Sequence, residues 1–237
     1  MTPPDPLPQV NRVQFDKTYR LIPSRYPPID LFERIGAPAD WELIADIEGL
    51  TNDRLRDEIG SISAVPVSER LAGPGASPIM AAFTHIGFAS RFTDGSFGVY
   101  YASSTFEGAL REVTHHRATF LARTSEPKTH FDLRCYVGRI DADLHDMRGG
   151  WPAEHHPLDY RFSQALAARL RAAGSNGLAF DSVRCPSAAN IGIFRPSVLA
   201  APPGKPHVTQ AAHVRVEWDG QRMARYIIVG EPRWNLL

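Results

Sequence analysis

The chain has 237 residues, of which 43% are hydrophobic and 10% aromatic. This length and composition are those of a folded globule that can bury a core without disulfide bonds. Lysine and arginine together number 26, as do aspartate and glutamate, so the formal net charge is zero. Such a chain has no overall field that would attract nucleic acid or an anionic membrane, so any anionic ligand must be held by local charges.

The sequence predicts a cytoplasmic protein without a metal site. No stretch approaches the roughly 20 apolar residues that cross a bilayer, and residues 1–11 are proline-rich where a signal peptide needs an apolar centre. The two cysteines, Cys135 and Cys185, have no CxxC motif or histidine-rich neighbourhood, so we expect no metal. The histidine pairs at 115–116 and 155–156 are expected to have surface or capping roles, because adjacent histidines on a helix project about 100° apart.

The first third of the chain is predicted to contain an arm, a strand and a helical insertion. Residues 1–16 are expected to be a flexible arm, because four prolines fall within the first eleven positions. Lys17–Ile22 predicts a strand, and residues 29–59 have helical periodicity, with Asp40 and Thr51 placed as N-caps. Residues 65–78 are rich in proline, glycine, serine and alanine, which favours either a surface loop or a lid.

The rest of the chain predicts a strand, a helix and then more strands. Phe97–Ala102 is a strand pattern, and Ser103–Thr105 followed by Glu107 indicates a capped helix that continues to Leu121. A second helix is expected at 160–173, ending at Gly174, and further strands at 133–140, 177–183, 190–194, 213–218 and 224–229. Strands grouped at both ends with helices between them predict an α+β fold, with a single domain and a mixed, curved sheet flanked by helices.

Several polar residues in these elements are candidates for chemistry, although each alone has an ordinary explanation. Arg20 can point to solvent from an edge strand, and Arg91 can be a loop charge. Glu112 can belong to a solvated helix face, and Ser182 can be a strand residue with a satisfied hydroxyl.

Four segments in order, taken together, resemble the RES domain, a family named for its Arg, Glu and Ser. They are Tyr19-Arg20-Leu21; Arg91-Phe92 with GVYYASS at 98–104; EGALREV at 107–113; and NGLAFDSVR at 176–184 with ANIGIF at 189–194. By this resemblance residues 17–230 form a RES domain with a helical insertion at about 29–78. Ala89, Asp181 and Ser187-Ala188 depart from the family pattern.

The resemblance implies a fold similar to ADP-ribosyltransferases and an enzyme that cleaves NAD⁺. The expected activity is that of an NAD⁺ phosphorylase, a glycosyltransferase with phosphate as co-substrate, in the toxin of a bacterial type II toxin–antitoxin system. A cognate antitoxin is expected to cover the active site, with a homodimer or a hetero-oligomer with the antitoxin as the assembly. No nucleic acid or membrane partner is expected.

The residue types suit this reaction. Breaking the nicotinamide–ribose bond develops positive charge at the anomeric carbon, which the carboxylate of Glu112 can stabilise. Arg20 and Arg91 can grip the diphosphate, and Tyr100 can supply a ring face for nicotinamide, with Tyr101 on the opposite side of the strand. The predicted catalytic residues are Glu112, Arg20, Tyr100 and Ser182, and the predicted NAD⁺-binding residues are Arg20, Arg91, Tyr100, Ser182 and Asn190. Ser182 is expected to donate hydrogen bonds rather than act as a nucleophile, because no histidine–acid pair accompanies it.

Three other readings remain open at this point. Transfer of ADP-ribose to a protein shares the first bond-breaking step and differs in the acceptor. A non-catalytic relative would bind nucleotide through the same pocket, and the altered turns near Arg91 and Ser182 keep this alternative open. A hydrolase with His115 or His116 as base has only the adjacency of the two histidines in its favour.

Overall fold

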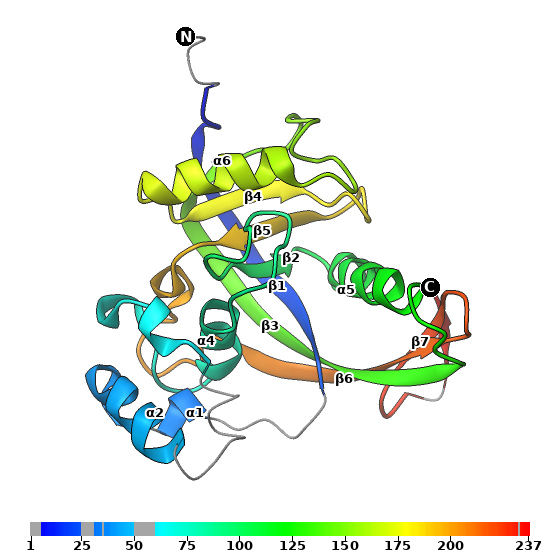
Figure 1. The fold of residues 1–237 in the computed structure, drawn as a ribbon, viewed down its shortest axis with the longest axis horizontal. Helices are drawn as coiled ribbons and strands as arrows, with labels where there is room; N and C mark the ends of the chain where they lie inside the picture. The colour runs from blue at the N-terminus through cyan, green and yellow to red at the C-terminus, as the bar shows by residue number, and fades with distance from the viewer. Residues whose placement is uncertain (1–5, 25–30, 35, 50–59, 232) are drawn as a thin grey trace.

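The computed structural model describes residues 6–24, 31–34, 36–49, 60–231 and 233–237. An eight-stranded sheet forms its frame, in the order β1-β2-β5-β4-β3-β6-β7-β8 (Figure 1). The strands are β1 (Val10–Pro23), β2 (Tyr100–Ser103), β3 (Thr129–Asp146), β4 (Gly177–Asp181), β5 (Ala189–Ile193), β6 (Thr209–Trp218), β7 (Met223–Ile228) and β8 (Asn235–Leu236). Only the pairing of β3 with β4 is parallel.

Strand β1 pairs with β3 as well as with β2, so five strands form a closed circuit of pairings. A circuit of this kind requires strong curvature, which the long strands β1 and β3 show in Figure 1. The prediction of an α+β fold with a mixed, curved sheet is confirmed.

Helices cover the sheet in three groups, each over its own hydrophobic cluster. Helix α6 (Arg161–Ala172) packs along β4, and α5 (Phe106–Leu121) packs beside β1 (Figure 1). The third group contains α1 (Leu31–Arg34), α2 (Trp41–Gly49) and α4 (Ser77–Thr84). Four short 3-10 helices, at Pro38–Asp40, Ile62–Ala64, Val67–Glu69 and Pro196–Leu199, complete the described elements. Among the described residues, no helix is long and apolar enough to cross a membrane.

The helices and strands predicted for the second half of the chain agree closely with the structure. Helix α5 is capped by Thr105, whose Oγ1 accepts a hydrogen bond from the Gly108 amide at 3.0 Å. Helix α6 ends before Gly174, which has a φ of +77°. The strands expected after it are all present, with ends shifted by a few residues.

The arm prediction is wrong for residues 10–16. These residues form the first half of β1, and Val10–Phe15 pair with the far half of β3, from Ile140 to His145. Val13 is fully buried in this half. The partner strand lies about 130 positions away in the sequence, so local composition does not reveal the pairing.

The expectation of a surface loop or lid at 65–78 is also wrong. Val65, Leu71 and Ala76 belong to the largest hydrophobic cluster, and part of the segment forms the start of α4. Gly75 has a φ of +81°, and a Cβ there would lie 2.3 Å from the carbonyl oxygen of Val208. Gly75 and Ala76 therefore serve close packing rather than mobility.

The insertion predicted at 29–59 is helical where it is described, in α1, α2 and the short helix before α2. Asp40 directly precedes α2, whereas Thr51 lies outside the described residues.

Candidate functional site

A cavity of about 390 Å³ lies between β1, β2, β5 and α5. Its size falls within the usual range of small-molecule sites. Its lining residues include Tyr19, Arg20, Leu21, Ser90, Arg91, Tyr101, Ser103, Glu112, His116, Tyr160, Phe180 and Asn190. Four of the six predicted site residues thus line the cavity, and a fifth, Ser182, binds Glu112, which does.

Three of the predicted site residues, Glu112, Ser182 and Asn190, meet in one hydrogen-bonded group. Oε1 of Glu112 accepts hydrogen bonds from the Ser182 hydroxyl at 2.9 Å and from Nδ2 of Asn190 at 3.3 Å. The Ser182 Oγ in turn accepts from the amide of Cys185 at 3.1 Å. Ser182 is 3% exposed and Asn190 5% exposed. Two donors on one oxygen fix the direction in which the carboxylate points.

A glycine at the start of α5 brings Glu112 to this position. A Cβ on Gly108 would lie 2.3 Å from Oγ of Ser103 and 2.8 Å from Cβ of Ala188. The helix can therefore begin in close contact with β2 and with the segment before β5. Glu112 follows one turn later, opposite Asn190 on β5.

Arg20 reaches the cavity where β1 and β2 diverge, since these strands pair only at Tyr19 and Ser103. Its Nη1 donates to the carbonyl oxygen of Tyr101 at 3.0 Å, and its buried Nε has no hydrogen-bond partner in the described part of the chain. Burial lowers the pKa of this guanidinium, although arginine remains charged in proteins. A cation with an unused donor thus lies in a cavity that also holds a carboxylate.

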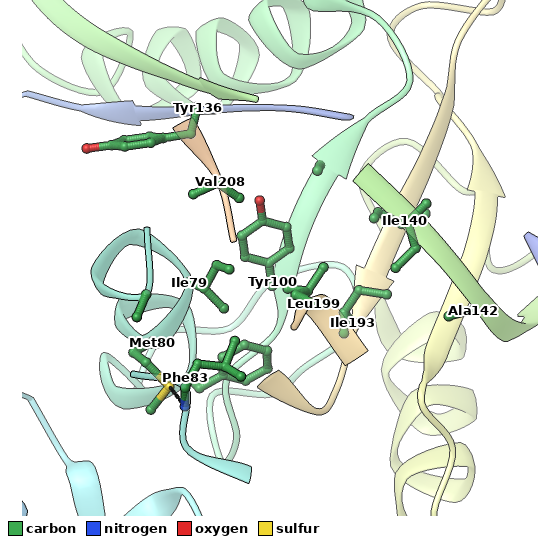
Figure 2. Close-up of a cluster of buried hydrophobic side chains, with 14 of the residues drawn as sticks. Ile79, Met80, Phe83, Tyr100, Tyr136, Ile140, Ala142, Ile193, Leu199 and Val208 are labelled. Atoms are coloured by element: carbon green, nitrogen blue, oxygen red, sulfur yellow. Dashed lines mark hydrogen bonds between the residues drawn. The ribbon is translucent and has the colours of Figure 1, made fainter. Parts of the chain in front are cut away.

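The prediction that Tyr100 forms a wall of the site is wrong, and the neighbouring Tyr101 occupies that position. Tyr100 is 1% exposed and lies among Ile79, Ile193 and Leu199 in the core (Figure 2). It reaches the site only through Arg20, whose Cζ lies 4.7 Å from the centre of the Tyr100 ring. Successive side chains of a strand point to opposite faces, and the pairing of β2 with β5 turns the second tyrosine to the cavity.

The hydroxyl of Tyr101 supports the turn that carries Arg91. It is bonded to the Ser90 hydroxyl at 2.8 Å and accepts from the Phe92 amide at 3.0 Å. Burial raises the pKa of Tyr101 to about 12. The ring therefore lines the cavity as a neutral phenol whose hydroxyl is already engaged.

Arg91 lies in the cavity wall, but one of its nitrogens is occupied. Nη1 donates to the carbonyl oxygens of Glu154 and His156, at 3.1 and 2.9 Å. Its Cζ lies 4.6 Å from the centre of the Tyr160 ring, and the side chain is 7% exposed overall. Burial lowers its pKa. Arg91 thus ties the loop before α6 to the cavity, and its contact with a diphosphate stays a prediction.

The lining residues that sequence reasoning missed include Tyr101, Tyr160 and His116. His116 had been given a surface role, yet it follows Glu112 by four positions, the spacing that places two residues on one helix face. Burial lowers the pKa of His116, against the opposing effect of Glu112, so the ring is neutral at pH 7. The four-residue spacing between Glu112 and His116 was the sequence signal that could have placed His116 in the site.

The other histidine pair has the capping role that was predicted. Nδ1 of His156 accepts from the amides of Leu158 and Asp159, at 3.2 and 2.8 Å. Nε2 of His155 accepts from the Asp181 amide at 3.2 Å. Within the described ranges, no group of three or more His, Cys, Asp or Glu side chains is placed to hold a metal ion.

The fold and the site define an α+β protein whose cavity combines a fixed carboxylate with buried guanidinium groups. The family model described as "RES domain" matches residues 69–219, and the chain belongs to that family. A relative, "Uncharacterized protein y4oC" of Sinorhizobium fredii (strain NBRC 101917 / NGR234), is 29% identical over 217 residues, covering 88% of this chain and 86% of that protein. A comparison with solved structures gives the crystal structure of the M. tuberculosis MbcT-MbcA toxin-antitoxin complex, with a TM-score of 0.41, 8% identity, and coverage of 90% of this chain and 87% of that one.

Proposed function

We propose that this RES-domain protein cleaves the nicotinamide–ribose bond of NAD⁺ and transfers the ADP-ribosyl group to phosphate, as an NAD⁺ phosphorylase. The observation that carries the proposal is the carboxylate of Glu112, held by Ser182 and Asn190 at the wall of a cavity that also contains Arg20. Membership of the RES domain family supports the same reaction.

The chemistry of the substrate explains why one carboxylate is central. The pyridinium ring leaves with the electron pair of the broken bond and becomes neutral nicotinamide, so the leaving group needs no proton. Positive charge develops on the ribose, and a carboxylate beside it is worth most in the transition state. Two donors on Oε1 hold Glu112 in place, so little reorganisation is needed as the charge forms.

The guanidinium groups have a separate task. NAD⁺ brings a diphosphate into a protein with no net charge, and the unused Nε of Arg20 can donate to it. The aromatic rings of Tyr101 and Tyr160 offer flat faces for the nicotinamide or the adenine. This arrangement assigns to Tyr101 the wall that the sequence had assigned to Tyr100.

Mass analysis of NAD⁺ incubated with the protein, with and without phosphate, tests the reaction. ADP-ribose 1″-phosphate and nicotinamide are the expected products. Labelling of a protein from NAD⁺ would instead favour ADP-ribosyl transfer, and binding of NAD⁺ without products would favour the non-catalytic reading.

Two glutamates on one helix provide a matched pair of variants. Glu112→Gln keeps the size of the side chain and removes its charge, so we expect a loss of at least 100-fold in kcat (about 2.7 kcal/mol). Glu107→Gln is the control, since Glu107 is exposed and bonded to Arg111. Equal activity of the two variants would contradict the role of Glu112.

We further propose that the activity is toxic, that the protein acts in the cytoplasm, and that an antitoxin covers the cavity. Induced expression in bacteria should arrest growth with the parent and not with Glu112→Gln. Co-expression of the antitoxin should restore growth. Normal growth with an active parent enzyme would refute the toxin role.

A further inference from the structure

The cavity wall beside Glu112 contains an acceptor without a partner. Asn190 lines the cavity and is 95% buried, and no described residue donates a hydrogen bond to its Oδ1. Leaving a buried carbonyl oxygen unpaired is unfavourable, so nearly all such atoms in native proteins have a partner. An unpaired acceptor in a cavity wall therefore indicates a ligand that donates to it.

The orientation of the amide follows from its neighbour. Nδ2 of Asn190 donates to Oε1 of Glu112 at 3.3 Å. A carboxylate only accepts hydrogen bonds, so turning the amide over would place two acceptors against each other. Oδ1 is therefore the end of the side chain that is left for a ligand.

Glu112 offers a second acceptor close by. Its Oε1 already receives Ser182 and Asn190, whereas no partner of Oε2 is found in the described part of the chain. The Ser182 hydroxyl is fully used, because it donates to Glu112 and accepts from the Cys185 amide. Two acceptors of this group, Oδ1 of Asn190 and Oε2 of Glu112, are thus left without a partner among the described residues.

We infer that Oδ1 of Asn190 and Oε2 of Glu112 together recognise the two neighbouring hydroxyls of the ribose that carries nicotinamide. Asn190 is then a residue that determines specificity for ribose over deoxyribose. The inference rests on the proposed function. A cis-diol supplies two O–H donors on adjacent carbons, whereas a carboxamide adds a carbonyl oxygen that needs a donor of its own.

This recognition acts on rate as well as on binding. In glycoside hydrolysis the hydrogen bonds to the hydroxyl beside the anomeric carbon strengthen in the transition state. Contacts that strengthen there raise kcat, and contacts that are equally strong in the bound substrate lower only KM.

The test compares NAD⁺ with analogues that lack the 2″ or the 3″ hydroxyl of this ribose, in turnover and in calorimetric binding. The parent should lose roughly 10- to 100-fold in kcat/KM on the analogue without the hydroxyl that Asn190 recognises. Asn190→Ala should lower kcat/KM on NAD⁺ by a similar factor relative to the parent. On that analogue the variant should be as active as the parent. Asn190→Leu, which is close to asparagine in size, provides a second variant should the alanine protein fail to fold.

Ser182→Ala is the matched control. Ser182 and Asn190 donate to the same oxygen of Glu112, but only Asn190 has a spare acceptor. Ser182→Ala should therefore be slower on all three dinucleotides, with unchanged ratios between them.

Two results would overturn the inference: Asn190 variants that discriminate as strongly as the parent, or a parent that treats the three dinucleotides alike. If the parent binds NAD⁺ without cleaving it, the proposed function fails, and the ratios of the dissociation constants still decide the inference. If it neither binds nor cleaves NAD⁺, both are refuted.

Discussion

Replacing Gly108 by alanine separates helix propensity from packing at the start of α5. Propensity alone predicts a gain in stability of up to about 1 kcal/mol, because glycine is the poorest helix former apart from proline. The structure predicts the opposite sign. The added Cβ would lie 2.8 Å from Cβ of Ala188 and 3.0 Å from Oγ1 of Thr105, besides the contact at 2.3 Å with Ser103.

The Ala188 contact is the one that cannot be relieved by a side-chain rotation, since its Cβ is fixed to the backbone. Overpacking of this kind costs about 1–3 kcal/mol, and disturbing the Thr105 cap costs about 1 kcal/mol more. We therefore expect Gly108→Ala to lose about 1–3 kcal/mol overall, or roughly 2–12 °C in Tm for a chain of this size.

Denaturant unfolding measures this change, with Gly150→Ala as the control. Nothing lies within 4 Å of a Cβ added to Gly150, so that variant should stay within about 0.5 kcal/mol of the parent. Gly108→Ala should also lower the turnover of NAD⁺, because the helix that moves carries Glu112. A Gly108→Ala protein as stable as the parent would refute this account of the packing.

Three further predictions concern ionisation and the loop before α6. Burial raises the pKa of Tyr100 and Tyr101 to about 12, above the ordinary 10. The stability that their neutral hydroxyls contribute is therefore full below pH 10 and is lost as the pH rises toward 12. An absorbance titration should show two tyrosines that ionise near pH 12, and Tyr101→Phe should remove one of them. The Arg148 guanidinium lowers the pKa of Asp146 to about 2. The contribution of the ionised Asp146 to the free energy of unfolding is therefore present above pH 4 and lost between pH 4 and 2. Asp146→Asn should reduce the loss of stability at acid pH that urea unfolding measures. A lysine at position 91 cannot bind the carbonyl oxygens of Glu154 and His156 and stack on the Tyr160 ring as the arginine does. Arg91→Lys should therefore accelerate hydrogen exchange in the loop before α6. Unchanged exchange would show that this loop does not depend on Arg91.

Local patterns were sufficient for much of the fold. The capped start of α5, the amphipathic α6 and the strands after it follow from turn residues and hydrophobic period, which act over a few residues. The joint presence of Glu112, Ser182 and Asn190 was predicted from a resemblance of ordered segments. Their hydrogen bonds to one another could not be predicted in that way.

Long-range pairing decided what the local patterns left open. The composition of residues 10–16 indicates an arm, but these residues belong to a strand that pairs with β3. The composition of residues 65–78 indicates a loop, but Val65, Leu71 and Ala76 pack into the largest hydrophobic cluster.

The division is clearest at the two adjacent tyrosines. The sequence alone determined that one of them faces the cavity and the other does not, because side chains alternate along a strand. The tertiary structure decided that Tyr101 is the one in the cavity and that Tyr100 is in the core. The physical reason is that the register of β2 against β5, set by partners far away in the chain, determines which face of the strand each residue occupies.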